Sequence, residues 1–121
     1  MREIKFRAWD KGTDGSDPEG MSYDQEFCHI MIRNNDGFEI MQFTGLKDKN
    51  GKEIYEGDLL KKKDADKPRV VKWTDQNGAY FVLSNSATKK VDWDDCLTDE
   101  HIKIFEYEVI GDTYSNPELL N

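Results

Sequence analysis

The chain of 121 residues carries 25 acidic and 17 basic side chains, which gives it a net charge of −8. A field of this sign repels nucleic-acid phosphates and anionic membranes, so we expect neither direct nucleic-acid binding nor membrane association. The two cysteines are far apart and make no disulfide framework, and no apolar run approaches the ~20 residues of a membrane-spanning helix. We therefore expect one domain over residues 1–121, without a targeting leader, in a reducing cytoplasm.

The first elements that the sequence predicts are two strands separated by a loop. Residues 3–9 alternate with the period of a half-buried strand, and one face is formed by Ile4, Phe6 and Ala8. Residues 11–20 are rich in glycine and acidic side chains, which predicts a flexible loop. Residues 26–33 also alternate and predict a second strand, whose two faces are Phe27, His29, Met31 and Cys28, Ile30, Ile32. A hairpin turn at residues 34–37 would lead into the next strand.

Residues 38–60 are the most informative stretch, because the polar sequence Asp48-Lys49-Asn50-Gly51 joins two strand patterns there. Aspartate can bond the backbone of its own turn, asparagine tolerates left-handed φ, and glycine supplies positive φ without steric cost. We therefore expect a hairpin with Gly51 at positive φ. The isolated Gly57 predicts a bend before the apolar pair at residues 59–60 re-enters the core.

The rest of the chain also reads mainly as β structure. A third hairpin is predicted over residues 70–83, with Asn77-Gly78 at its corner, followed by a short strand at 91–93. Residues 94–100 could form a single helical turn, and residues 102–110 are expected to form the last strong strand. About eight short strands with frequent turns predict an all-β fold, a small antiparallel barrel or sandwich of SH3-like form, with at most one short helical turn.

Three ordered segments carry a resemblance to a known family. They are residues 4–10 (IKFRAWD), the central segment 41–58 and the closing segment 108–120. Together they resemble the YopX family of phage and prophage proteins, although the match departs at residues 12–20 and is weakest over residues 61–100. The signature positions of the central segment are Gly45, Asp48, Asn50, Gly51, Tyr55, Gly57 and Asp58. The resemblance implies a small, mostly β, phage-encoded protein, and it transfers no catalytic residue.

Few residues could carry chemistry. The available soft or imidazole metal ligands are Cys28, His29, Cys96 and His101. Adjacent residues on a strand point to opposite faces, and no Cys-x-x-Cys or His-x-x-x-His pair occurs, so this set is a poor zinc site and a poor cysteine–histidine nucleophile. Glu106 and Glu108 lie two apart on a predicted strand face and could act as acid and base, but such charges are usually the solvated side of a strand. We expect no metal, no cofactor and no catalytic residue.

Two further features could bind a partner. An acidic rim around apolar residues is interpreted as a solvated loop or as a protein-binding surface, and its members are Asp92, Trp93, Asp94, Asp95, Asp99 and Glu100. The tail, residues 112–121, ends in adjacent leucines whose burial is favourable. We expect it to pack on its own domain or on a second subunit of a homo-oligomer, through Tyr114, Pro117, Leu119 and Leu120.

The function that these features favour is a non-enzymatic module that binds a protein partner. The first alternative is a small hydrolase or metal-dependent enzyme that uses the Glu106/Glu108 pair or the cysteine–histidine set. The second alternative is an acidic mimic of DNA that inhibits a host protein, which would need a ridge of carboxylates spaced like phosphates.

Overall fold

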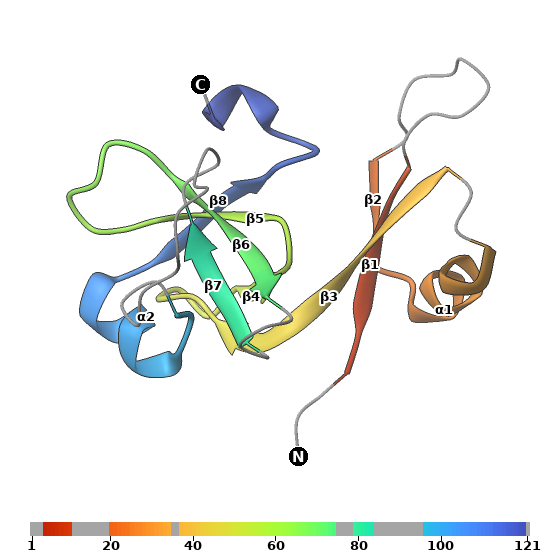
Figure 1. Ribbon diagram of the computed structural model, residues 1–121, viewed down its shortest axis with the longest axis horizontal. Helices are drawn as coiled ribbons and strands as arrows, with labels where there is room; N and C mark the ends of the chain where they lie inside the picture. Colours follow the sequence, from red (N-terminus) through yellow and green to blue (C-terminus); the bar gives the residue numbers. More distant parts are fainter. Residues whose placement is uncertain (1–3, 11–19, 35–36, 75–78, 84–95, 121) are drawn as a thin grey trace.

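Most of the described chain is antiparallel β structure. The computed structural model describes residues 4–10, 20–34, 37–74, 79–83 and 96–120 (Figure 1). In chain order its elements are β1 (Phe6–Asp10), β2 (Gly20–Ser22), α1 (Gln25–Asn34), β3 (Phe38–Lys47), β4 (Glu53–Tyr55), β5 (Asp58–Lys61), β6 (Arg69–Thr74), β7 (Ala79–Leu83), α2 (Asp99–Phe105), β8 (Glu108–Asp112) and the 3-10 helix η3 (Pro117–Leu120). Two four-stranded sheets have the orders β2-β1-β3-β4 and β7-β6-β5-β8. The predicted class, a small antiparallel β fold, is confirmed.

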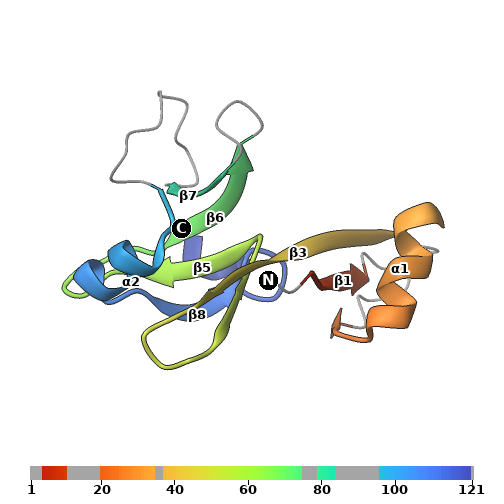
Figure 2. The ribbon, with the colours of Figure 1, turned by 90° about the horizontal axis from the view of Figure 1, so that it is seen from below.

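The long strand β3 connects the two ends of the molecule. Its first half pairs with β1, and its second half pairs with β4, where Phe43 lies opposite Tyr55. The register shifts between Phe43 and Lys47, and a bulge of this kind bends a strand and increases its twist. Figures 1 and 2 show α1, β1 and β2 at one end of β3, with α2 and strands β4 to β8 at the other.

The hydrophobic core lies at the end of the molecule that holds α2 and strands β4 to β8, between these strands and α2. Its buried members are Ile54, Leu60, Val71, Tyr80, Val82, Leu97, Ile102 and Tyr107. Full burial of a valine, leucine or isoleucine side chain contributes about 1.5–3 kcal/mol, so this cluster supplies much of the free energy that holds the strands together.

The polar turn between β3 and β4 also holds β8 in place. Asp48 Oδ1 accepts hydrogen bonds from the backbone N–H of Asn50 at 2.8 Å and of Lys52 at 2.9 Å, while Oδ2 accepts one from the N–H of Val109 at 2.9 Å. Gly51 completes the turn with a φ of 84°, as the turn pattern predicts. One buried carboxylate therefore joins its own turn to a strand 61 positions later in the chain.

The bend predicted at Gly57 is also present. Its φ is 83°, its N–H donates to the carbonyl of Val71 at 2.9 Å, and its carbonyl accepts from the N–H of Thr113 at 2.9 Å. L side chains rarely adopt this backbone conformation, so a glycine is favoured where the chain turns from β4 into β5.

The strand predicted at residues 26–33 is wrong, because these residues lie in α1. Asp24 caps the helix, since its Oδ1 accepts hydrogen bonds from the N–H of Glu26 at 3.0 Å and of Phe27 at 3.2 Å. Apolar residues occupy so many positions here that they satisfy the period of a helix as well as that of a strand. The buried face of the helix runs through Phe27, Cys28 and Met31, and Cys28 is fully buried.

The first half of the strand predicted at residues 102–110 is wrong as well. Thr98 caps α2 by accepting a hydrogen bond from the N–H of His101 at 3.0 Å, and the helix ends at Phe105, followed by its C-cap Glu106 with a left-handed φ of 51°. Ile102 faces the core from this helix, and β8 begins only at Glu108. The described chain thus contains two α-helices, whereas the sequence predicted at most one helical turn.

Several other predicted features fall on or beside residues outside the described ranges. They are the flexible loop at 11–20, the corner at Asn77-Gly78 and the strand at 91–93. Of the loop, only Gly20 is described, and it is the first residue of β2. The hairpin turn predicted at 34–37 includes residues 35 and 36, which also lie outside the described ranges; α1 ends at Asn34 and β3 begins at Phe38. Among the described helices, none is long and apolar enough to cross a membrane.

Candidate functional site

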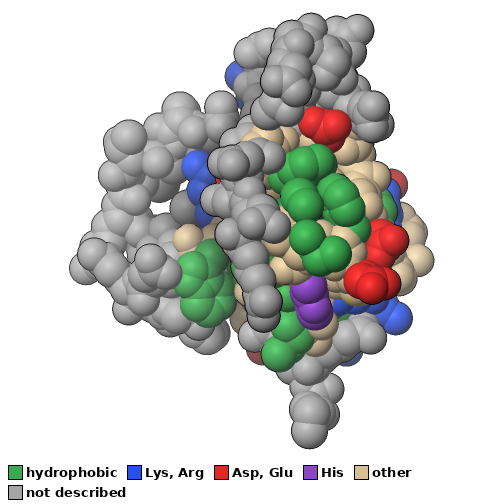
Figure 3. Space-filling view, turned by 90° about the vertical axis from the view of Figure 1, so that its right-hand side faces the viewer, with side chains coloured by type: hydrophobic (Ala, Val, Ile, Leu, Met, Phe, Trp, Pro, Cys, Tyr) green, Lys and Arg blue, Asp and Glu red, His purple; other side chains and the backbone are tan. Residues whose placement is uncertain are grey.

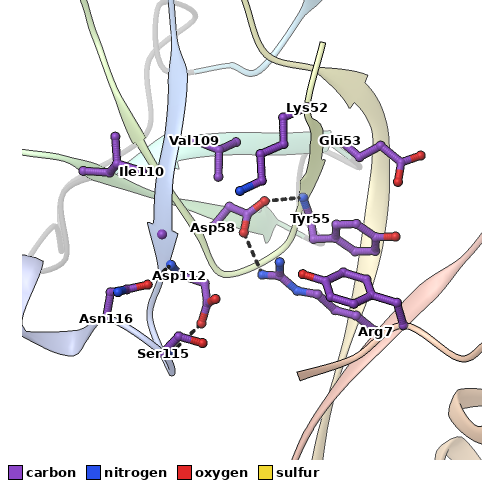
Figure 4. Close-up of a pocket in the computed structure, with 12 residues that line it drawn as sticks. Arg7, Lys52, Glu53, Tyr55, Asp58, Val109, Ile110, Asp112, Ser115 and Asn116 are labelled. Atoms are coloured by element: carbon purple, nitrogen blue, oxygen red, sulfur yellow. Dashed lines mark hydrogen bonds and ion pairs between the residues drawn. The ribbon is translucent and has the colours of Figure 1, made fainter. Parts of the chain in front are cut away.

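A buried ion pair joins the two ends of the molecule. The Nη2 atom of Arg7, from β1, lies 2.8 Å from Oδ1 of Asp58, the first residue of β5, and each side chain is 3% exposed (Figure 4). The other carboxylate oxygen of Asp58 accepts a hydrogen bond from the N–H of Tyr55 at 2.8 Å. Arg7 also donates to the carbonyl of Glu56 at 3.0 Å, and its guanidinium lies 4.8 Å from the centre of the Tyr55 ring. The pair therefore anchors β1 to the β4–β5 bend through several contacts.

The surroundings of this ion pair shift the pKa of two carboxyl groups, those of Asp58 and Glu56. Burial raises the pKa of Asp58, and the charge of Asp112 raises it further, while Arg7 and the N–H of Tyr55 lower it. Burial also raises the pKa of Glu56, against the hydrogen bond from the N–H of Gln42 and the charge of Arg7, which lower it. The ionised form of Asp58 thus depends on its contact with Arg7.

A cavity of about 520 Å³, which we call the central cavity, opens beside the pair. Its walls are formed by β1, by β4 and the residue before it, and by β8 and the turn after it. Its polar lining residues include Arg7, Lys52, Tyr55, Asp58, Asp112 and Asn116. Val109 and Ile110 form an apolar part of the wall (Figure 4). Arg7, Asp58 and Asp112 lie in the opening, central and closing segments that carry the family resemblance, so all three segments meet at this cavity.

The tail is folded back on its own chain next to the central cavity. Asp112 Oδ1 accepts hydrogen bonds from the N–H of Tyr114 at 3.0 Å and of Ser115 at 2.7 Å, and Asn116 Oδ1 accepts one from the N–H of Asp112 at 3.2 Å. The Tyr114 ring stacks on Trp9 of β1 with 5.9 Å between the ring centres.

Of the other tail residues named from the sequence, Leu119 is half-buried and Pro117 is exposed, while the side chain of Leu120 lies outside the described part of the chain.

The surface of α1 that faces solvent, which we call the α1 face, carries two exposed isoleucines. Ile30 is 49% exposed and Ile32 is 44% exposed, and being two residues apart in a helix they lie on opposite flanks of it. His29, directly before Ile30, and Glu26 are also exposed. Figure 3 shows hydrophobic side chains gathered at this end of the molecule, interrupted by a histidine and bordered by acidic side chains. Scattered exposed isoleucines are ordinary, but an apolar patch with a charged border is typical of a binding surface.

A groove of about 410 Å³ lies between α1 and the edge strand β2. Its apolar lining includes Met21, Phe27 and Phe38, and the last two rings contact each other with 5.2 Å between their centres. Asp10 and Asp24 add two carboxylates to the same lining. The groove therefore combines an apolar floor with negative charge at its border.

The structure does not assemble the predicted cysteine–histidine set. Cys28 is buried in α1, whereas Cys96 and His101 lie at the α2 end, where His101 Nδ1 is 2.6 Å from the carbonyl oxygen of Cys96 (Figure 1). Burial raises the pKa of both thiols, with a further increase for Cys28 from the charge of Asp24, so neither favours the nucleophilic thiolate. Among the described residues, no group of three or more histidine, cysteine or acidic side chains is arranged to hold a metal ion.

The predicted glutamate pair does not share a strand face. Glu106 is the cap of α2, and its carboxylate lies 3.1 Å from the Lys63 ammonium. Glu108 is in β8, and its carboxylate lies 3.7 Å from the Lys49 ammonium. The prediction of a shared face is wrong because Glu106, the left-handed cap of α2, lies outside β8, which begins at Glu108.

The predicted acidic surface is only partly described. Asp99 and Glu100 lie exposed in the first turn of α2, while Asp92, Trp93, Asp94 and Asp95 lie outside the described residues. Of the signature positions, Asp48, Asn50 and Gly51 form the β3–β4 turn, Gly45 lies in the bulged part of β3, and the other three lie at the β4–β5 bend next to the ion pair.

Arg7, Asp112 and the α1 face were missed as site residues by reasoning from the sequence. Arg7 falls on the polar face of the first predicted strand, and its partner Asp58 is far along the chain, so no local signal reveals the pair. For α1, a signal was present: Asp24 directly precedes residues whose apolar members recur at helical spacing.

Comparisons with known proteins agree with the segments described above. A family model described as YopX protein matches residues 5–121. The crystal structure of protein EF1440 from Enterococcus faecalis is similar over 100% of both chains, with 30% sequence identity and a TM-score of 0.58. No protein with a curated description matches the chain.

Proposed function

Because the chain belongs to the YopX family, we propose that it is a phage- or prophage-encoded, non-enzymatic interaction module that acts in the bacterial cytoplasm. The observation that carries this proposal is the α1 face, where Ile30 and Ile32 are half-exposed on the two flanks of the helix, beside an acidic border. We infer that a partner protein covers this face and the groove between α1 and β2.

The chemistry of the face indicates the kind of partner. Phe27 and Phe38 offer an apolar floor for a side chain, while Asp24 and Glu26 favour a basic border on the partner. The net charge of −8 would steer a cationic segment towards the protein and repel an anionic one. A short amphipathic segment rich in lysine or arginine satisfies both conditions.

The described polar groups support binding better than catalysis. Asp58 is held by Arg7 and a backbone N–H, Glu106 and Glu108 are each next to a different lysine, and both thiols are kept protonated by burial. An acid, base or nucleophile must be available to a substrate, and these groups are already engaged or in the inactive protonation state.

Replacing Ile30 and Ile32 together by glutamine tests the proposal. Covering two half-exposed isoleucines is worth about 2 kcal/mol, so the double variant should bind a partner roughly 30-fold more weakly. The matched control is Ile104→Gln, because Ile104 is 60% exposed on α2 at the opposite end.

The defined probe is a labelled amphipathic peptide of leucine and lysine, and its leucine–glutamate counterpart is the negative probe. Anisotropy titration should show salt-sensitive binding of the lysine peptide to the parent and to the Ile104 variant, with weakened binding to the double variant. Equal binding of both peptides, or equal binding by all three proteins, would refute the α1 face as the binding surface. Capture from a host lysate with the same three proteins then identifies the natural partner.

A further inference from the structure

The central cavity has a charge arrangement that the α1 face does not explain. Two of its acidic residues are neutralised by ion pairs: Asp58 by Arg7, and Glu53 by Lys5. Two lining charges remain, the ammonium of Lys52 and the carboxylate of buried Asp112, and no ion pair joins either to another described residue. The cavity therefore presents one positive and one negative group.

These two groups enter the cavity lining from different elements, Lys52 from just before β4 and Asp112 from the end of β8. Figure 4 shows Lys52 above Asp58, and Asp112 lower, to the left of the Arg7 guanidinium. The Nε atom of Arg7, whose side chain lines the same cavity, is buried and has no hydrogen-bond partner in the described part of the chain. A buried donor of this kind normally meets an acceptor from protein, water or ligand.

We propose that the central cavity binds a small zwitterion of the α-amino acid class, with its carboxylate at Lys52 and its ammonium at Asp112. The volume of about 520 Å³ lies in the range of small-molecule sites and leaves room for a side chain against Val109 and Ile110.

A zwitterion fits better than an ion of a single sign. A simple anion would satisfy Lys52 but would lie close to the carboxylate of Asp112, and a simple cation would satisfy Asp112 but would lie close to Lys52. Placing a charge beside a like charge in a partly desolvated site is unfavourable, so binding requires both charges on one molecule. The proposal does not depend on a protein partner at the α1 face.

NMR titration of the full chain with the standard free L-amino acids tests the proposal. At least one should cause saturable shifts of the backbone amides of Gly111, Asp112 and Ser115. The same amino acid with its amine acetylated or its carboxylate amidated should bind at least about tenfold more weakly, because each change removes one charge.

Two variants locate the site. Lys52→Met removes an exposed ammonium, and Asp112→Asn keeps one oxygen that can accept from both the Tyr114 and Ser115 N–H groups, so both variants should fold. Each should weaken binding at least about tenfold. The control is Lys61→Met, an exposed lysine of β5 outside the lining, which should bind like the parent. The proposal is overturned if no free amino acid gives saturable shifts, if a capped form binds equally well, or if Lys52→Met has no effect.

Discussion

Replacing Arg7 by methionine should destabilise the protein strongly. Methionine keeps an unbranched side chain, but Asp58 loses its cation at 2.8 Å while remaining buried. The N–H of Tyr55 would be its one remaining described hydrogen-bond donor. Removing one partner of a buried ion pair costs about 3–5 kcal/mol, because the other charge is left uncompensated. This is a large part of the roughly 5–15 kcal/mol that stabilises a typical domain.

The loss should depend on pH in a defined direction. Arg7 lowers the pKa of Asp58 against burial, so its removal should let burial raise that pKa further. A carboxyl group whose pKa is higher in the folded state than in the unfolded state loses stability as pH rises through the folded pKa. The loss in free energy of unfolding of the variant, relative to the parent, should therefore be greatest at neutral pH. It should become smaller as pH falls and Asp58 is protonated.

Denaturant unfolding at neutral pH and at mildly acidic pH measures this effect. The Arg7→Met, Asp58→Asn double variant is the control, because it removes both charges and should recover much of the lost free energy. The reasoning is refuted if Arg7→Met unfolds within about 1 kcal/mol of the parent at neutral pH, or if its deficit is the same at both pH values.

Three other changes test the rest of the fold. Gly51→Val should cost about 1–3 kcal/mol through backbone strain alone, since apart from the two chain neighbours no atom of the described residues lies within 4 Å of the added Cβ, and an unchanged melting temperature would contradict this. Asp48→Ala should cost about 2–4 kcal/mol by leaving three backbone N–H groups without their acceptor, and Asp48→Asn, which keeps one oxygen, should cost less in the same denaturant titration. Removing residues 117–121 should lower the melting temperature at unchanged oligomeric state, because it removes the half-buried Leu119; a loss of oligomer would instead make the tail an assembly element.

The sequence by itself determined those features that depend on local chemistry. The order of residues in Asp48-Lys49-Asn50-Gly51 is enough to specify a tight polar turn, and Gly57 is enough to indicate a bend, because conformational preferences of this kind act within a few residues. The frequent turns and short apolar runs likewise predicted a small antiparallel β fold. The same local segments carried the family resemblance.

Tertiary structure decided whether segments with an ambiguous apolar pattern form a helix or a strand. Residues 26–33 have apolar side chains at positions that suit a strand and a helix equally, and the packing of Cys28 and Phe27 beside β1 and β3 selects the helix. Residues 99–105 are similar, since burial of Ile102 in the core is compatible with a helix capped by Thr98.

Tertiary structure also decided the candidate site. Nothing near Arg7 in the sequence shows that it meets Asp58, or that Asp112 lies beside both, because ion pairing and burial depend on chain segments that only folding brings together. Local preferences act over a few residues and can be read in order, whereas the central cavity exists only where three distant segments meet.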